Sequence, residues 1–368
     1  MVKPSLSPGL PLVHAPPLGS RQPIDDEPER SPGDVRIDRP ERMSHRGIIG
    51  QAVVYAVNGV RAFYSDHFVL PLPDGHRFPM AKYSGLRQRI LDTGILPRAA
   101  LHEAPAASWD DLRLVHTPDY VEAVATGTVA PDVQRRIGFP WTPGMVERSR
   151  RSVGATIAAT RAALDDGLAA NLAGGTHHAF ADRGEGYCVF NDVAVAARVL
   201  LRDSAISRIA IVDCDVHQGN GTAAIFRDDP AVFTFSMHGA TNFPFRKEQS
   251  DLDVALPDGA GDDTYLPLLE RHLAQVLDSH RPECVYYLAG ADPYEGDRLG
   301  KLTLSIAGLR RRDEIVLQRC RALGIPTVIT MSGGYAHDID AIVTIHAATI
   351  EVAARLSGVF PWPSPSVS

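Results

Sequence analysis

The segment from Asp213 to Thr222 carries the densest group of residues that could do chemistry. Its sequence, D-C-D-V-H-Q-G-N-G-T, follows an apolar, β-branched run expected to form a buried strand. At a period of two, Asp213, Asp215 and His217 point to the same side of that strand. Three ionisable groups there are costly unless a cation or a hydrogen-bond network satisfies them. The pattern predicts a divalent metal site, and the competing interpretation is a capped strand end with solvated carboxylates.

A third protein ligand for such a metal is available after a later strand. Asp292 lies in the motif G-A-D-P, directly after the apolar run Val285–Ala289. An Asp-Pro pair after a strand also begins ordinary turns, so this residue alone does not decide between the two roles.

Two further motifs carry groups suited to acid–base and oxyanion chemistry. His177 and His178 follow a Gly-Gly pair, and Tyr335 follows another. An imidazole with a pKa near 6.5 accepts a proton from water and returns it to a leaving amine at neutral pH. A tyrosine hydroxyl donates a hydrogen bond to a developing oxyanion. Each motif taken alone is also compatible with an ordinary surface loop.

The elements that must position these groups alternate between strand and helix along the chain. This alternation predicts an α/β fold with a single-domain, open, mostly parallel sheet and helices on both faces. In such sheets ligands bind beyond the carboxyl ends of the strands, where the motifs above lie. The expected strands are Val60–Tyr64, Arg208–Val212, Val232–Ser236, Cys284–Leu288 and Thr327–Thr330, and the expected helices are Met145–Asp166, Val193–Leu201, Tyr265–Ser279, Gly308–Leu323 and Ile339–Leu356.

The composition predicts one domain between two flexible tails. Residues 1–44 are rich in proline and charge and poor in aromatic residues, so they cannot bury enough apolar surface to offset chain entropy. Residues 361–368 contain three prolines and are expected to end the fold in the same way. We expect one domain over residues 45–360, in which neither a repeat nor a linker is evident.

Composition also excludes several classes of protein. The net charge of −7 provides no basic field for nucleic acid, so no direct nucleic-acid binding is expected. The sequence contains neither an apolar run long enough to cross a bilayer nor a secretory signal, which predicts a cytoplasmic protein without a membrane partner. The four cysteines are scattered without a C-x-x-C pair and are expected to be buried, reduced thiols.

Taken together and in this order, the motifs resemble the histone deacetylase superfamily, whose fold is also called the arginase/deacetylase fold. The resemblance covers Arg61 to Leu356, nearly the whole predicted domain. Three longer strings, Pro71–Tyr83, Gly186–Ala197 and Gly290–Leu302, look most like the bacterial branch close to the class IV deacetylases.

The resemblance implies a role for each motif. Asp215, His217 and Asp292 match the family's metal ligands, which normally hold Zn²⁺, although the same ligand types suit Fe²⁺. His178 matches the general base, and His177 matches its mainly electrostatic neighbour. By the same resemblance, Asp213 holds His177 and fixes its tautomer, and Tyr335 hydrogen-bonds the scissile carbonyl.

The resemblance also implies a substrate channel and a second ion. Tyr187 and either Phe243 or Phe245 fall where aromatic residues form the channel wall. The family often binds a structural K⁺ near the zinc, at positions matched here by Asp213, Asp215, His217, Ser236 and Met237.

One position departs from part of the family. Where some members place an aspartate behind the second histidine, this chain has Asn220. An amide orients His178 without adding a negative charge, so it raises the imidazole pKa less than a carboxylate would. We therefore expect a neutral His178 in the resting protein, suited to act as a base.

The implied activity is a zinc-dependent amidohydrolase that removes an acetyl or longer acyl group from a primary amine such as the ε-amine of lysine. Its partners would be acylated lysine peptides or proteins, or an acylated small amine. Alternatives are an acetylpolyamine or small-metabolite deacetylase of the same superfamily and a non-catalytic module that binds acyl-lysine. An arginase-like urea hydrolase is disfavoured because its two metals need more carboxylates. A nucleotide-binding protein is disfavoured because neither G-x-G-x-x-G nor a P-loop follows the first strand. The oligomeric state stays open.

Overall fold

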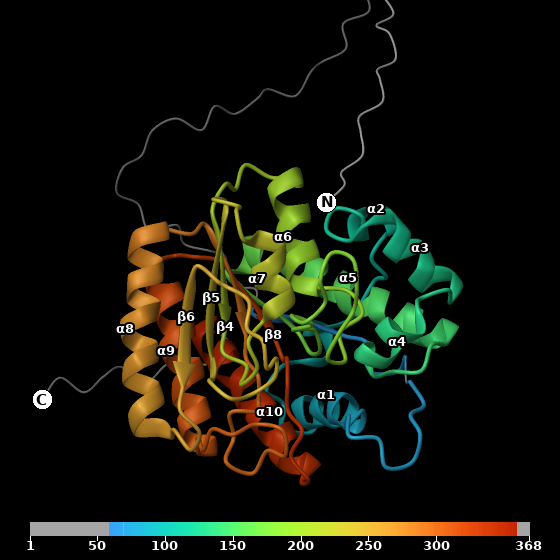
Figure 1. Cartoon of the computed structure of the whole chain (residues 1–368). Coiled ribbons are helices and arrows are strands. Elements are labelled where there is room, and N and C mark those ends of the chain that lie inside the picture. Colours follow the sequence, from blue (N-terminus) through green and yellow to red (C-terminus); the bar gives the residue numbers. More distant parts are fainter. Residues whose placement is uncertain (1–58, 69, 359–368) are drawn as a thin grey trace, which may run out of the picture. The chain divides into compact units, whose positions relative to one another are not determined.

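A sheet of eight parallel strands organises the chain. The computed structural model describes residues 59–68 and 70–358, so the predicted tails, residues 1–44 and 361–368, lie outside the described residues. The strand order is β2-β1-β3-β8-β7-β4-β5-β6, and every neighbouring pair in it is parallel (Figure 1). The strands are β1 (Arg61–Tyr64), β2 (Leu101–Glu103), β3 (Leu168–Asn171), β4 (Ile209–Asp213), β5 (Val232–Gly239), β6 (Leu252–Leu256), β7 (Cys284–Leu288) and β8 (Thr327–Thr330).

Helices cover both faces of this sheet. In Figure 1, α8 and α9 lie on one side of the strands and α5 and α6 lie on the other. The helices are α1 (Ala81–Thr93), α2 (Trp109–Leu112), α3 (Pro118–Thr126), α4 (Pro131–Ile137), α5 (Pro143–Asp166), α6 (Asp192–Asp203), α7 (Asn220–Phe226), α8 (Asp262–His280), α9 (Ile306–Ala322) and α10 (Ile339–Leu356), with one 3₁₀ turn at Arg98–Ala100. The predicted fold class is therefore confirmed. None of the helices in the described part of the chain is long and apolar enough to cross a membrane.

The period of two along each strand divides the core into two layers. Ala210 and Val212 of β4 pack in the layer that contains α8, α9 and α10, and Ile209 and Ile211 pack in the layer that contains α5 and α6. Because both faces of the strand are covered, its residues form a continuous apolar run instead of an alternating pattern. The same run is what made this strand predictable.

Most predicted elements agree with the structure within a few residues. The helix predicted at Ile339–Leu356 has those bounds as α10, and α5 begins at Pro143, where Thr142 accepts a hydrogen bond from the Met145 amide as an N-cap. Strand β5 continues three residues beyond the predicted Ser236, because Phe235–Gly239 pairs with β6.

The sequence analysis did not predict β3. Its sequence, L-A-A-N, lacks the β-branched and aromatic residues that favour strands. Its position in the middle of the sheet, between β1 and β8, determines its conformation instead. This strand leads into the loop that carries the two adjacent histidines. The short β2 and β6 and the helices α1 to α4 and α7 were also not predicted.

The long helix α5 meets an extended segment at a glycine. The Ala107 amide donates to the Arg150 carbonyl at 3.0 Å, and the Arg150 side chain donates back to the Ala107 carbonyl. A Cβ atom on Gly154 would lie 1.9 Å from the Pro105 carbonyl oxygen, well inside contact distance. Only glycine fits the helix at this approach.

We predict that Gly154→Ala destabilises the protein by about 1–3 kcal/mol, the usual cost of forcing an extra carbon into a packed site. Gly144→Ala in the first turn of α5 is the matched control, because its nearest neighbouring atom would lie 3.6 Å away. Gly154→Ala gains up to about 1 kcal/mol of helix propensity and Gly144→Ala in the first turn gains less, so a Gly154→Ala variant that is less stable than Gly144→Ala reports the clash. Urea unfolding measures it, and equal midpoints for the two variants would contradict the close packing described above.

Candidate active site

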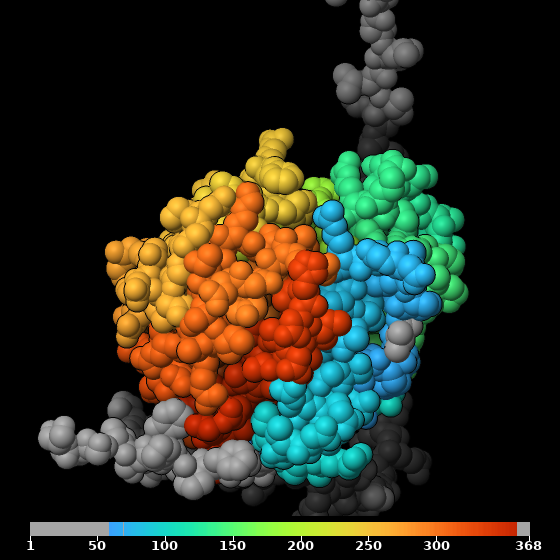
Figure 2. Space-filling view, turned by 90° about the horizontal axis from the view of Figure 1, so that it is seen from below, coloured from blue at the N-terminus to red at the C-terminus, as the bar shows by residue number. Residues whose placement is uncertain are grey.

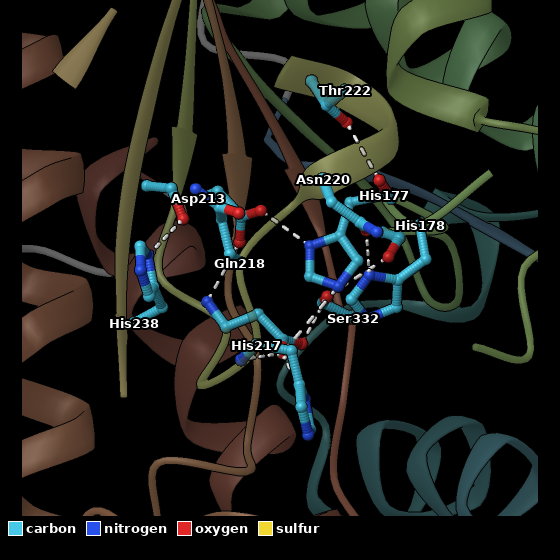
Figure 3. Close-up of polar contacts among 12 residues, drawn as sticks. His177, His178, Asp213, His217, Gln218, Asn220, Thr222, His238 and Ser332 are labelled. Carbon is cyan, nitrogen blue, oxygen red and sulfur yellow. Dashed lines mark hydrogen bonds and ion pairs between the residues drawn. The ribbon is translucent and has the colours of Figure 1, made fainter. Parts of the chain in front are cut away.

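The candidate site lies at the carboxyl ends of the central strands. The loop after β3 carries His177 and His178, the loop after β4 carries Asp215 and His217, and the loops after β7 and β8 carry the remaining groups. Figure 3 shows that the side chains from these separate loops come together. This is the edge at which ligands bind in open α/β sheets.

Three buried side chains from two loops form a compact cluster. The ligand atoms of Asp215, His217 and Asp292 all lie within 4.8 Å of one another. His217 Nδ1 lies 3.0 Å from Asp215 Oδ1 and 3.1 Å from Asp292 Oδ2. The three side chains are almost completely buried. Two carboxylate oxygens and one imidazole nitrogen therefore face a single point.

Backbone and hydroxyl donors hold the outer carboxylate oxygens. The Gly333 amide and the Ser332 hydroxyl both donate to Asp215 Oδ2 at 2.7 Å, and the Val216 amide donates to Asp292 Oδ1 at 2.9 Å. These contacts fix the orientation of both carboxylates. Donors of this kind support ligand geometry in metal sites.

The cluster fits a divalent cation. Burial and the charge of Asp215 raise the pKa of Asp292 to about 7, so without a cation the two carboxylates repel each other. A divalent ion removes that repulsion and matches the donor set, which suits Zn²⁺ and also Fe²⁺. Three protein ligands leave a coordination position open, as catalytic zinc sites require.

One structural premise of the sequence analysis is wrong. Strand β4 ends at Asp213, so a period of two does not extend through Asp215 and His217. A turn takes over, in which the Asp215 amide donates to Asp213 Oδ1 and the His217 amide donates to Asp215 Oδ1. Asp213 consequently lies outside the three-residue cluster and accepts a 2.6 Å hydrogen bond from His177 Nδ1 (Figure 3).

The partner of His178 fixes its tautomer. His178 Nδ1 lies 2.7 Å from Asn220 Oδ1 (Figure 3). Asn220 Nδ2 donates to Glu185 Oε1 at 3.4 Å. The contact with Glu185 orients the amide, so its oxygen faces the ring and His178 Nδ1 carries the proton. In the neutral ring, Nε2 is then the unprotonated nitrogen.

The two histidines have opposite electrostatic environments. Burial disfavours the His177 imidazolium, but the charges of Asp213 and Asp215 outweigh this and raise its pKa to about 9. Burial and the positive charges of His177 and His217 lower the pKa of His178 well below 6.5. A charged His177 beside a neutral His178 is the arrangement expected when one ring is a proton acceptor.

Tyr335 projects a phenol that stays protonated. Burial and the charges of Asp215 and Asp292 raise its pKa well above its ordinary value. Its backbone is held from both sides, because its amide donates to Asp297 Oδ2 at 2.6 Å and its carbonyl accepts from Arg298 Nε at 2.5 Å. The residue can therefore donate a hydrogen bond from a fixed position.

Two buried cations that the sequence analysis missed tie the loops together. Arg312 of α9 is fully buried and donates to the Gly290 carbonyl at 2.5 Å, next to the loop of Asp292. Lys82 of α1 donates to the carbonyls of Ser332 and Gly334 at 3.1 and 3.3 Å. Neither residue belongs to a local motif with chemical meaning, so no local pattern indicated their positions.

The three predicted channel aromatics line one outer pocket. Tyr187, Phe243 and Phe245 line a cavity of about 670 Å³, with His178 and Tyr335 also in its lining. The Phe243 ring meets the His178 ring edge-on at 5.0 Å. A smaller inner cavity of about 40 Å³ lies against the same histidine and tyrosine. That the aromatics contact substrate stays a prediction.

The predicted K⁺ site rests on neighbouring strands. Ser236 of β5 lies opposite Asp213 of β4, and Met237 follows it in β5. The Ser236 hydroxyl lies 3.0 Å from His238 Nδ1. Potassium binding by these residues together with Asp215 and His217 stays a prediction.

Comparisons with known proteins point to one family. A model of the histone deacetylase domain matches residues 76–350. An uncharacterized protein of Picosynechococcus sp. is 47% identical over 291 residues, which cover 78% of this chain and 96% of that protein. Histone deacetylase 2 of Arabidopsis thaliana is 30% identical over 310 residues, which cover 80% of each chain.

A bacterial relative and a solved structure agree with this match. The histone deacetylase-like amidohydrolase of Pseudomonas aeruginosa is 30% identical over 284 residues, covering 72% of this chain and 74% of that protein. The structure of a histone deacetylase homologue complexed with SAHA has a TM-score of 0.69 and 25% identity, covering 82% of this chain and 84% of that one. The narrower resemblance to the bacterial branch close to the class IV deacetylases stays a prediction.

We predict that the purified protein binds about one equivalent of Zn²⁺ or Fe²⁺ and that Asp292→Ala loses it, because catalytic sites of this type need three protein ligands. Elemental analysis measures the metal content, and the melting temperature measures the stabilisation that binding adds. Asp278→Ala, a change of an exposed aspartate on α8, is the matched control. Full metal content in Asp292→Ala would contradict the ligand assignment.

Proposed function

Because the chain belongs to the histone deacetylase family, we propose that it is a metal-dependent amidohydrolase that removes an acetyl or longer acyl group from a primary amine such as the ε-amine of lysine. The observation that carries this proposal is the convergence of three kinds of group on one pocket. His178 supplies an unprotonated Nε2, Tyr335 supplies a protonated hydroxyl, and a buried three-residue cluster supplies cation ligands.

Asp215, His217 and Asp292 would hold the cation. A divalent ion bound there supplies Lewis acidity and lowers the pKa of water within its reach. The donor set and its buried, hydrogen-bonded carboxylates support Zn²⁺ as that ion, and Fe²⁺ fits the same ligands.

The chain's own residues would move the protons. His178 Nε2 accepts a proton from the attacking water as the water oxygen bonds to the carbonyl carbon. His177, held by Asp213, keeps a positive charge beside this step. The Tyr335 hydroxyl donates to the carbonyl oxygen as negative charge develops on it. His178 then returns the proton to the amide nitrogen as the carbon–nitrogen bond breaks, and an amine and a carboxylate leave.

The direct test is amine release from a small panel of substrates by the metal-loaded protein. The panel contains an acetyl-lysine peptide, a long-chain acyl-lysine peptide and acetylputrescine. We expect turnover of at least one member, no turnover by His178→Ala, and a loss of about 10²-fold in kcat for Tyr335→Phe, the usual effect of removing an oxyanion donor. Metal content is measured on each variant, so that loss of the proton acceptor is separated from loss of the ion. Full kcat in Tyr335→Phe would contradict its assigned role.

We predict that Asn220→Asp moves the acidic limb of the kcat/KM profile to higher pH. A carboxylate beside His178 Nδ1 stabilises the imidazolium and raises the pKa of the ring, so the free base is lost at a higher pH during acidification. Asn220→Ala is the control, since it removes the hydrogen bond without adding charge and should lower kcat without this upward movement. An unmoved limb in Asn220→Asp would show that His178 does not set it.

A further inference from the structure

The charged side chains that line the outer pocket are mainly cationic. Arg77, Arg135, Arg136 and Lys301 line it together with a single carboxylate, Glu185. The four cationic residues are exposed at the surface. This local excess of positive charge contrasts with the net charge of −7 of the whole chain.

Two of these cations have no carboxylate partner within the described part of the chain. Arg136 lies 3.5 Å from Asp132, and Lys301 lies 3.5 Å from Asp258, so both have a carboxylate neighbour. For Arg77 and Arg135, no carboxylate within 4.0 Å occurs among residues 59–68 and 70–358. The carboxylate of Glu185 already accepts a hydrogen bond from Asn220. Asn220 is neutral, so Glu185 keeps its charge, and among the described residues the rim carries two unpaired arginines against one unpaired carboxylate, an excess of positive charge.

The segments that carry these arginines are fixed to the pocket wall. The Gly186 amide donates to the Arg136 carbonyl and the Tyr187 amide donates to the Ile137 carbonyl, both at 2.9 Å, so the end of α4 is bonded to the channel segment. His76 Nε2 donates to the Gly138 carbonyl at 2.9 Å, because its Nδ1 accepts from the Phe78 amide.

The Arg77 loop is also bonded to the other side of the rim. Arg298 Nη2 donates to the Arg77 carbonyl at 2.8 Å. Figure 2 shows the corresponding surface, on which the blue segment near the start of the described chain lies beside orange and red segments from its last third. Hydrogen bonds to the backbone therefore hold the Arg77 loop and the end of α4, which carries Arg135, at the rim.

We propose, on the basis of the deacylase function above, that this cationic rim selects substrates that carry negative charge next to the acylated amine and rejects polyamines. A carboxylate near the amide would meet Arg77 and Arg135, whose guanidinium groups match carboxylate geometry. A polycation would meet a pocket entrance that is also positively charged, and this repulsion lowers its local concentration and its rate of association. The shared chemistry of the substrate is a carboxylate beside the acyl amide, supplied by acidic residues of a peptide or by the free carboxylate of an acyl-amino acid.

The test compares kcat/KM across substrates that differ in charge. Acetyl-lysine peptides flanked by aspartate, serine or lysine are measured beside free Nε-acetyl-lysine and acetylputrescine, at low and high salt. We expect the aspartate-flanked peptide to exceed the lysine-flanked peptide by about 10-fold or more at low salt, with the difference shrinking as salt screens the rim. The ranking of the acidic peptide against free Nε-acetyl-lysine identifies the source of the carboxylate.

Charge reversal at the rim should reverse this preference. In the double variant Arg77→Glu/Arg135→Glu we expect the lysine-flanked peptide to become the better substrate, mainly through KM. Arg321→Glu is the matched charge control, because the C-terminal end of α9 precedes β8 and so lies at the opposite end of the strands. Phe245→Ala is the neutral control at the rim, and it should leave the ratio between acidic and basic peptides unchanged.

The outcomes separate this inference from the proposed function. Turnover with equal kcat/KM for acidic and basic peptides, or with acetylputrescine preferred, overturns the inference and leaves the deacylase proposal standing. Absence of turnover on every substrate counts against the deacylase proposal. In that case fluorescence anisotropy of labelled acyl-lysine peptides measures their binding affinity directly. Tighter binding of the acidic peptide supports the inference, and equal or weaker binding overturns it.

Discussion

Two carboxylates buried against one imidazole are the constraint to which the central loops conform. Asp215 and Asp292 lie close together at the carboxyl ends of the strands, where they are buried and water does not screen their charges. The surrounding loops consequently point amide and hydroxyl donors at the carboxylates, and their glycine positions leave no space for a side chain. A Cβ atom on Gly333 would lie 1.9 Å from Asp292 Oδ2, and one on Gly290 would lie 2.8 Å from Asp215 Oδ2. Behind the same loops, Arg312 and Lys82 bind backbone carbonyls and place positive charge at the back of the site.

The sequence was sufficient where one local pattern determines one structure. The apolar run of β4 and the capped start of α5 identify a strand and a helix without help from the rest of the chain, and the residue types of the D-x-D-x-H segment indicate where cation ligands could gather. Strand β3 could not be found in this way, because its alanines favour no strand and its conformation depends on β1 and β8. The expectation that a period of two would continue from Asp213 through His217 also failed, because a turn replaces the strand after Asp213.

Residues whose role depends on contacts with distant parts of the chain could not be predicted either, because no local pattern records those contacts. Arg312 lies in a helix with several other arginines, and only the fold shows that it alone is fully buried against the Gly290 carbonyl. Arg77 and Arg135 are 58 positions apart in the sequence, and the bond between His76 and Gly138 brings their segments together. A charge balance computed along the chain averages such local excesses away, which is why an acidic protein can present a basic rim.

The place of β8 in the sheet has a consequence for folding during synthesis. This strand, the last in the chain, inserts between β3 and β7, which are the third and the seventh. During synthesis the sheet therefore stays divided into two parts, with β3 and β7 unpaired on the sides that face β8, until residues 327–330 emerge from the ribosome. The Ser332 and Gly333 donors that orient Asp215 emerge only after that strand. Nascent chains thus carry all three candidate cation ligands before the donors that orient Asp215 emerge, and during that interval the edges of β3 and β7 are open to pairing with other chains.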